Sequence, residues 1–255
     1  MTNNLIKTAN YLRIYSIAAQ WENIEKKPAL LSVLTELLTW EEEERKRRRL
    51  ELLMRKNGLK QIDFMADFDW KWPKKIDKEQ IEDFFSLKFM IENVNIVLIG
   101  ANGLGKTMIA QNLIQTACKQ GYSALFVESS RMLADLMTQT ANVGLERALL
   151  RYVKPKLLAI DEVGYLAYDT RHADLLFQLM NRRTPNSSTI ITTNRPFAEW
   201  PSVFPNAASV TALVDRLIER CEVSKIEGAS YRTKKFTERE NQRRTNKKNN
   251  SLGIE

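Results

Sequence analysis

Histidine is almost absent from this sequence, where His172 stands alone among 255 residues. Zinc sites of the usual cysteine–histidine kind, and a Ser-His-Asp triad that rests on any other histidine, are therefore excluded. Cysteine is nearly as rare, with only Cys118 and Cys221. Both occupy apolar positions of helices that the sequence predicts, so we expect them to be core residues of a cytoplasmic protein.

Long apolar runs are also missing. No stretch approaches the ~20 apolar residues that a membrane-spanning helix requires, and residues 1–10 lack the apolar segment of a secretion signal. We therefore expect no contact with a membrane. The net charge of +8 favours a polyanionic partner, most simply nucleic acid, although ordinary solubility charge explains that value equally well.

The pattern of residues divides the chain into four parts. Residues 1–58 are expected to form a helical domain that serves a partner or assembly. An aromatic-rich connector follows at 59–93, and an α/β domain at 94–233. The stretch from Lys234 to Lys248 holds seven basic and two acidic residues, so we expect 234–255 to be a basic, disordered tail.

The second predicted helix of the N-terminal part contains a block without any apolar residue, Glu41–Arg49. Each of its four glutamates precedes a basic residue by four positions. Such a pair contributes ~0.2–0.5 kcal/mol, so the block can be helical without packing. It is either a solvated helix or a helix that stands between two bodies or touches nucleic acid.

From residue 94 onward, apolar runs typical of buried strands alternate with helical patterns. This alternation predicts an α/β fold in which helices flank a parallel sheet on both faces. The predicted strands are 96–99, 123–127, 157–160, 189–193 and 223–226.

The first of these strands leads into the phosphate-loop pattern G-x-x-x-x-G-K-[ST]. A strand that turns through glycines into a helix aims backbone N–H groups and the positive end of the helix dipole at one point, where a triphosphate fits. Lys106 would contact the outer phosphates, and the Thr107 hydroxyl would bind Mg²⁺. The expected ATP-contacting residues of the loop are Gly100, Ala101, Asn102, Gly103, Leu104, Gly105, Lys106, Thr107 and Met108.

Two carboxylates follow the strand at 157–160, at the strand end where open α/β sheets bind ligands. Asp161 would hold Mg²⁺ through water, and Glu162 would take the proton from the attacking water. A simple turn is the alternative, but after a phosphate loop the metal and base pair is the stronger interpretation. Asn194, which ends the strand at 189–193, could orient the lytic water or merely form a turn.

Three arginines follow in the C-terminal part of this domain. Arg216 and Arg220 are expected together on one helix, beside its apolar stripe. Either could reach the γ-phosphate of a neighbouring subunit, and ordinary surface arginines fit the spacing equally well. Arg232 comes after the last strand and could turn back to the phosphates of its own subunit.

These segments together resemble the IstB/DnaC-type AAA+ ATPases, and most of all the IstB branch, the ATPase helpers of insertion-sequence transposases. The similarity covers about residues 30–233. It implies that Asn194 is sensor 1, that Arg216 is a finger acting on the neighbouring subunit, and that Arg232 is sensor 2. Leu104 and Met108 replace residues more usual in the family. The matching motifs are residues 100–107, 157–165, 192–194, 215–217 and 230–232.

The resemblance further implies a homo-oligomer that binds ATP and Mg²⁺, assembles on double-stranded DNA and regulates the transposase of the same element. A DnaC-type helicase loader would share every one of these ATPase motifs. A small-molecule kinase is disfavoured, because the pair Asp161–Glu162 and the finger arginines suit hydrolysis between subunits. A binding module that uses ATP only as an assembly ligand remains a third alternative.

Overall fold

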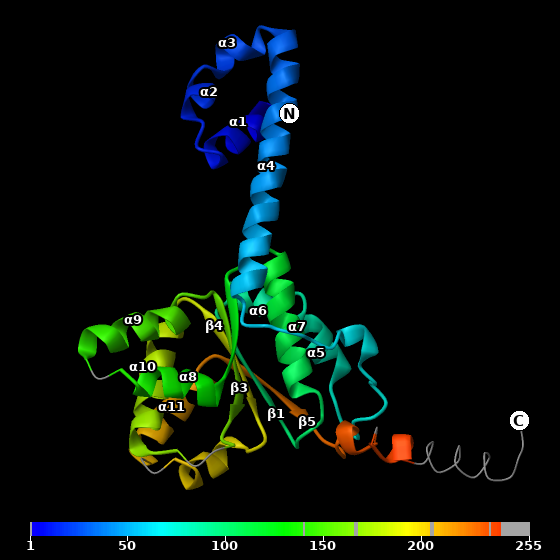
Figure 1. Ribbon diagram of the computed structural model, residues 1–255, viewed down its shortest axis with the longest axis vertical. Helices are drawn as coiled ribbons and strands as arrows, with labels where there is room; N and C mark the ends of the chain where they lie inside the picture. The colour runs from blue at the N-terminus through cyan, green and yellow to red at the C-terminus, as the bar shows by residue number, and fades with distance from the viewer. Residues whose placement is uncertain (1, 140, 166–167, 205–206, 235, 241–255) are drawn as a thin grey trace, which may run out of the picture. The chain divides into compact units, whose positions relative to one another are not determined.

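The structure, a computed structural model, describes residues 2–139, 141–165, 168–204, 207–234 and 236–240. It divides into two compact units between Met54 and Arg55. The first unit is entirely helical (Figure 1). Its helices are α1 (Thr2–Tyr11), α2 (Tyr15–Ala19), α3 (Trp21–Glu25) and most of α4 (Pro28–Lys56).

The first unit has a small core of its own. Ala9 of α1 and Leu12 of the turn after α1 are buried against Leu38 of α4. At the rim of this core the Thr8 hydroxyl donates to Glu42 at 2.9 Å, and Arg45 Nη1 donates to the Leu12 carbonyl at 2.9 Å. Helix α1 and the turn that follows it are therefore held to α4 by both apolar and polar contacts.

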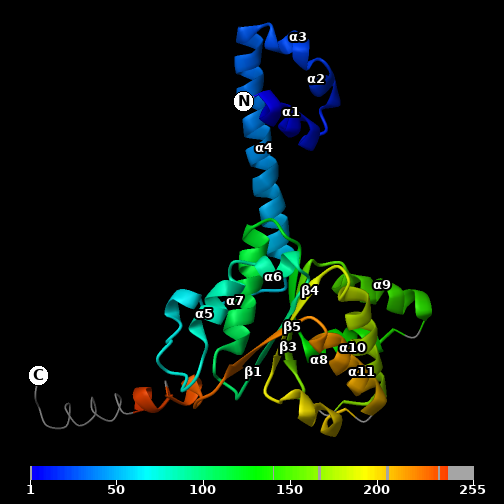
Figure 2. The same ribbon diagram turned by 180° about the vertical axis from the view of Figure 1, so that it is seen from behind.

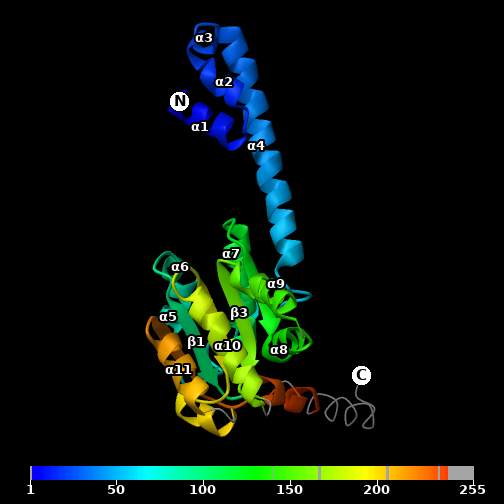
Figure 3. The same ribbon diagram turned by 90° about the vertical axis from the view of Figure 1, so that its left-hand side faces the viewer.

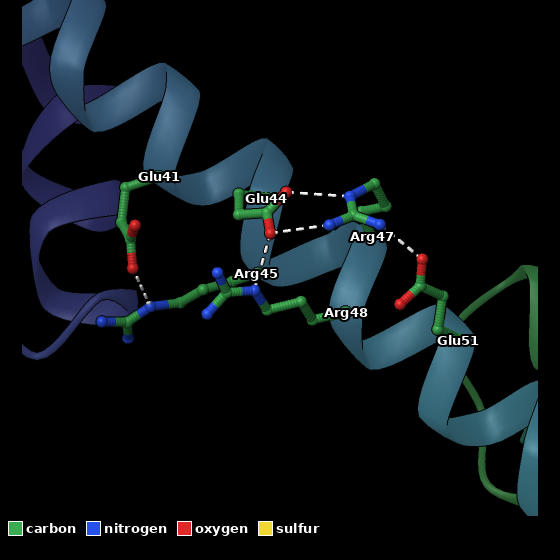
Figure 4. Close-up of polar contacts among 6 residues, drawn as sticks. All are labelled: Glu41, Glu44, Arg45, Arg47, Arg48 and Glu51. Carbon is green, nitrogen blue, oxygen red and sulfur yellow. Dashed lines mark hydrogen bonds and ion pairs between the residues drawn. The ribbon is translucent and has the colours of Figure 1, made fainter.

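The charged block of α4 is helical, and its side chains form a row of ion pairs (Figure 4). Arg45 pairs with Glu41 at 2.7 Å and Arg48 with Glu44 at 2.6 Å, at the predicted spacing. Arg47 pairs with Glu44 and Glu51, where the spacing had favoured Glu43. Hydrogen bonds from Arg47 and Arg48 lower the pKa of Glu44 to about 2.

The second unit is built on a parallel sheet of five strands in the order β2-β3-β4-β1-β5. All five predicted strands are present, several with longer ends. Strand β4 lies between β1, which leads into the phosphate loop, and β3, which carries Asp161 and Glu162. The end of β4 is therefore placed between these two parts of the candidate site. The strands are β1 (Asn95–Gly100), β2 (Ala124–Glu128), β3 (Leu157–Val163), β4 (Ser188–Thr193) and β5 (Cys221–Ile226).

Helices cover both faces of this sheet, as predicted (Figures 1 and 2). One face carries α5 (Lys78–Phe84), α6 (Lys88–Ile91) and α7 (Lys106–Lys119). The other carries four helices, of which α10 and α11 pack side by side (Figure 3). These are α8 (Ser129–Met137), α9 (Asn142–Val153), α10 (Thr170–Arg183) and α11 (Ala207–Ile218). None of the described helices is long and apolar enough to cross a bilayer.

One helix boundary differs from the prediction and moves a cysteine. The apolar spacing extended the last helix through Cys221, but α11 ends at Ile218 and Cys221 begins β5. Its backbone pairs with Asn95 of β1, and this pairing outweighs the local helical pattern. Cys118 lies in α7 and is buried, as predicted.

Part of the predicted tail lies within the described residues. Residues 231–234 and 236–240 are helical, whereas 241–255 lie outside the described residues. Lys234 is fixed by an ion pair with Asp69 at 3.2 Å, and its ammonium lies 4.5 Å from the ring centre of Trp72. These contacts hold Lys234 against the connector.

A buried arginine fastens the sheet at the amino ends of β3 and β4. Arg183 is fully buried, and its guanidinium donates to Thr189 Oγ1 at 3.0 Å. Burial lowers its pKa to about 9. It also donates to the carbonyls of Tyr152, Val153, Pro155 and Ser188, at 2.7, 3.0, 2.9 and 2.6 Å.

Candidate functional site

The phosphate loop joins β1 to α7 in the conformation that its glycines allow. Gly103 and Gly105 have φ angles of +77° and +88°, which side-chain-bearing residues rarely adopt. A Cβ at Gly103 would lie 2.2 Å from Ser230 Oγ, and one at Gly105 would lie 2.4 Å from the Phe68 ring. Both the turn and the close neighbours therefore require glycine.

Lys106 is the first residue of α7 and lies inside this loop. Its ammonium donates to the carbonyls of Gly100 at 2.7 Å and Ala101 at 2.9 Å. Burial lowers the pKa of Lys106 to about 8, against the opposing attraction of Asp161 and Glu162. The cation thus faces the place where the loop would cradle phosphate oxygens.

The carboxylate of Asp161 is held between the strand ends. Thr107 Oγ1 donates to Asp161 Oδ1 at 3.1 Å, and the Thr192 hydroxyl of β4 donates to the same oxygen. Burial raises the pKa of Asp161, while these two hydrogen bonds lower it. A hydroxyl oxygen and a carboxylate oxygen this close together are suitable ligands for Mg²⁺. This ion needs few protein ligands when it also binds phosphates and water.

Glu162 follows directly but points into a different environment. Its side chain is exposed and lines the same pocket as Lys106 and Thr107. The pKa of Glu162 is raised, first by partial burial and then by the charges of Asp161 and Glu128. The two adjacent carboxylates are therefore separated in role, one buried among hydroxyls and one open to the pocket.

The wall of the pocket that faces the loop was missed by the sequence analysis. The cavity has a volume of about 460 Å³, and Phe68, Trp72 and Pro73 of the connector line it. Trp72 Nε1 donates to the Ala229 carbonyl at 2.8 Å, and its ring lies edge to face with Tyr231 at 6.0 Å. The pocket is large enough for a small ligand, and flat aromatic groups suit a nucleotide base.

Comparison with known proteins places the chain in a family. A family model described as "IstB-like ATP binding protein" matches residues 8–239. The chain belongs to this family. It is 34% identical over 219 residues to a protein of insertion sequence IS232 from Bacillus thuringiensis subsp. berliner, covering 86% of this chain and 88% of that one. A protein of IS21 from Pseudomonas aeruginosa is 33% identical over 190 residues, covering 74% and 72%.

Both relatives are named for ATP binding, and ATP binding by IstB-like proteins agrees with the phosphate loop and its pocket. Among solved structures, DnaI superposes with a TM-score of 0.52 at 20% identity, covering 66% of this chain and 89% of that one. This likeness concerns the fold alone, the P-loop AAA+ arrangement of a parallel sheet flanked by helices.

The remaining predicted site residues of this IstB-like chain lie at different distances from the pocket. Arg232 lines it and acts electrostatically on Lys106 and Glu162. Asn194 follows β4, and its side-chain oxygen is buried with no hydrogen-bond partner among the described residues. Asn194 is not among the residues that line the pocket, so its role in orienting water stays a prediction.

Arg216 is not among the residues that line the pocket. It is half-buried on α11, where Nη1 pairs with Glu219 at 2.7 Å. Arg220 was predicted to share this helix, but it lies in the turn after α11, where its carbonyl accepts from Asn95 N at 2.8 Å. The two arginines therefore do not form the predicted pair on one helix face.

Proposed function

We propose that this IstB-like protein is an ATPase that assembles on double-stranded DNA as a homo-oligomer and assists the transposase of its own insertion sequence. The observation that carries hydrolysis is Glu162, an exposed carboxylate with a raised pKa in the pocket that also contains Lys106 and Thr107. A protein that used ATP only as an assembly ligand would not need a base at this place.

Each residue of the site has a distinct part in this proposal. Thr107 and Asp161 hold Mg²⁺, which neutralises charge on the phosphates when bound. Lys106 binds the outer phosphate oxygens. Glu162 takes a proton from a water molecule whose oxygen bonds the γ-phosphorus, while the bond from that phosphorus to the ADP oxygen breaks. Asn194 orients this water.

The second unit also offers a basic face to the DNA backbone. Arg147, Arg151 and Lys154 are exposed and recur at helical spacing along α9 and its C-terminal cap, and Arg131 is exposed on α8. Arg151 pairs with Asp135 at 2.8 Å, and Glu146 of the same helix pairs with Arg182 at 2.7 Å. Arg131, Arg147 and Lys154 have no ion pair among the described residues, so their charges are available to a polyanionic partner.

DNA binding is expected to require ATP, to be weakly sequence-specific and to weaken steeply as salt rises, because phosphate contacts release counterions. Changing Arg147, Arg151 and Lys154 together to Gln should reduce the slope of log affinity against log salt by about 3, about one for each phosphate that is no longer neutralised. Fluorescence anisotropy with labelled duplex DNA at several salt concentrations measures this.

The matched control removes three charges from the opposite face of the sheet, with Lys78, Lys88 and Lys119 changed to Gln. This control should keep the slope of the unaltered protein. A flat salt response of the unaltered protein would contradict DNA backbone binding. Equal slopes for the two triple variants would contradict the placement on α8 and α9.

The first unit is the proposed element for recruiting the transposase. Its helix α4 exposes an apolar stripe at spacings of three and four residues: Leu30, Val33, Leu37 and Trp40 are 43%, 55%, 49% and 57% exposed. The helix pairing within the unit buries Leu38 and leaves this stripe uncovered. A protein partner is the simplest reason to keep such side chains in water.

Changing Leu37 and Trp40 together to Gln should leave folding and ATP turnover intact, because both side chains are exposed, and should abolish binding to the transposase. Co-purification of the two proteins and the transposase strand-transfer rate measure this. Leu52→Gln, on the same helix and also exposed, is the matched control. Undiminished stimulation by the double variant would remove the stripe as the recruiting surface, and binding of a replicative helicase in its place would favour a helicase loader.

A further inference from the structure

The backbone turn that carries Glu162 has an unusual conformation. Glu162 has a φ of +61°, the left-handed region that residues other than glycine rarely occupy. The pairing of β3 with β4 is also irregular between Ile160 and Val163. A strained backbone of this kind persists only where the surrounding structure holds it, and such strain is concentrated at functional sites.

Hydroxyl groups from three different segments hold this turn. Glu162 N donates to Thr192 Oγ1 at 2.9 Å, and Ser129 Oγ donates to the Glu162 carbonyl at 2.9 Å. Two residues further along, Gly164 N donates to the Tyr168 hydroxyl at 3.0 Å. The peptide groups on both sides of the left-handed residue are therefore bound by side chains.

Arg195 adds a link from the turn that follows β4. Its Nε donates to the Gly164 carbonyl at 3.1 Å, while the Thr193 hydroxyl accepts from Arg195 N at 3.1 Å. Asn194 lies between Thr193 and Arg195 in the chain. The turn of the base and the turn of the proposed water-orienting residue are thus joined through one guanidinium.

Ser129 and Tyr168 act as a single buried unit. Their oxygens lie 3.3 Å apart, and the two residues are 2% and 5% exposed. The Tyr168 ring stacks on Phe204 at 4.2 Å with the planes 5° apart. Ser129 begins α8 directly after β2. Packing fixes both hydroxyls, so they can fix the backbone to which they are bonded.

We propose that Ser129 and Tyr168 are positioning residues that hold the carboxylate of Glu162 where it can take a proton from the attacking water. Neither residue lines the nucleotide pocket, so their effect passes through the backbone of Glu162 and Gly164. This inference rests on the proposed role of Glu162 as the base. It assigns a catalytic consequence to two buried hydroxyls that would otherwise count only toward packing.

The test uses the full-length protein and Tyr168→Phe, which removes one oxygen and keeps the ring on Phe204. We expect kcat for ATP turnover to fall by about 10- to 100-fold, the size of loss that follows small misplacements of reacting groups. ATP affinity, measured at equilibrium with a fluorescent ATP analogue, should not change, because the pocket walls are intact. Ser129→Ala should give the same separation of kcat from affinity.

Tyr152→Phe is the matched control. Tyr152 is 4% exposed, and its hydroxyl donates to Asp135 at 2.7 Å, outside the nucleotide pocket. The Tyr152→Phe variant loses a hydroxyl oxygen from a similarly buried ring, as Tyr168→Phe does, and it should keep full kcat. Because Tyr168 works through Glu162, adding Tyr168→Phe to Glu162→Gln should lower the single-turnover rate no further.

The outcomes separate this inference from the proposed function. Wild-type kcat in both Tyr168→Phe and Ser129→Ala, with Glu162→Gln inactive, would overturn the positioning role and leave the base in place. A further full loss in the Glu162→Gln background, or an equal loss in Tyr152→Phe, would also overturn it. Wild-type turnover in Glu162→Gln would overturn the base and this inference together.

Discussion

Glu162→Gln is expected to bind ATP normally and to lose turnover by about 10²- to 10⁴-fold, the usual contribution of a general base. Lys106→Ala is expected to lose ATP binding itself, because the phosphate loop loses the cation that lies inside it. Equilibrium binding of a fluorescent ATP analogue and the rate of phosphate release separate the two results.

Glu128→Gln is the control for the loss of a nearby negative charge. Glu128 ends β2, and its charge raises the pKa of both Asp161 and Glu162, yet it does not line the nucleotide pocket. Turnover should survive this change. Near-wild-type turnover in Glu162→Gln would remove Glu162 from the role of base.

Arg216→Ala should bind ATP normally and hydrolyse it ~10³-fold more slowly, if α11 of one subunit supplies a finger to the next. Within its own subunit Arg216 pairs with Glu219 and stays outside the nucleotide pocket. Phosphate release at a protein concentration that permits assembly measures the effect. Arg220→Ala is the matched control, because Arg220 lies beyond the end of the same helix.

A mixture of Arg216→Ala with Lys106→Ala should recover part of the activity. Each variant then supplies the group that the other lacks, so mixed interfaces contain one complete site. Mixtures that demonstrably co-assemble and yet show no recovery would mean that Arg216 acts within its own subunit or only in the fold.

The strands and the phosphate loop could be predicted because their signals are local. Short runs of apolar and β-branched residues that lead to Gly100, Asp161 and Asn194 mark β1, β3 and β4 without reference to any other segment. The end of α11 could not be predicted in this way. Its helical spacing continues to Cys221, and only pairing with Asn95, far away in the sequence, turns that residue into the start of β5.

The same distinction separates the two walls of the candidate site. Lys106 and Thr107 follow from a pattern of eight residues. Trp72 reaches the pocket through a bond to the Ala229 carbonyl, 157 residues away in the chain. The aromatic composition of the connector indicated only that it packs on something. No sequence pattern marked Ser129 and Tyr168 either. Their proposed role depends on hydrogen bonds to the backbone of Glu162 and Gly164, and these bonds form only in the fold.

Arg183 has a consequence for how this molecule comes apart. Its guanidinium gathers carbonyls from the end of α9, the turn before β3 and the start of β4. If one of these segments frayed alone, it would leave buried donors without acceptors, which is unfavourable. The amino ends of β3 and β4 should therefore open together, as one cooperative unit in native-state hydrogen exchange.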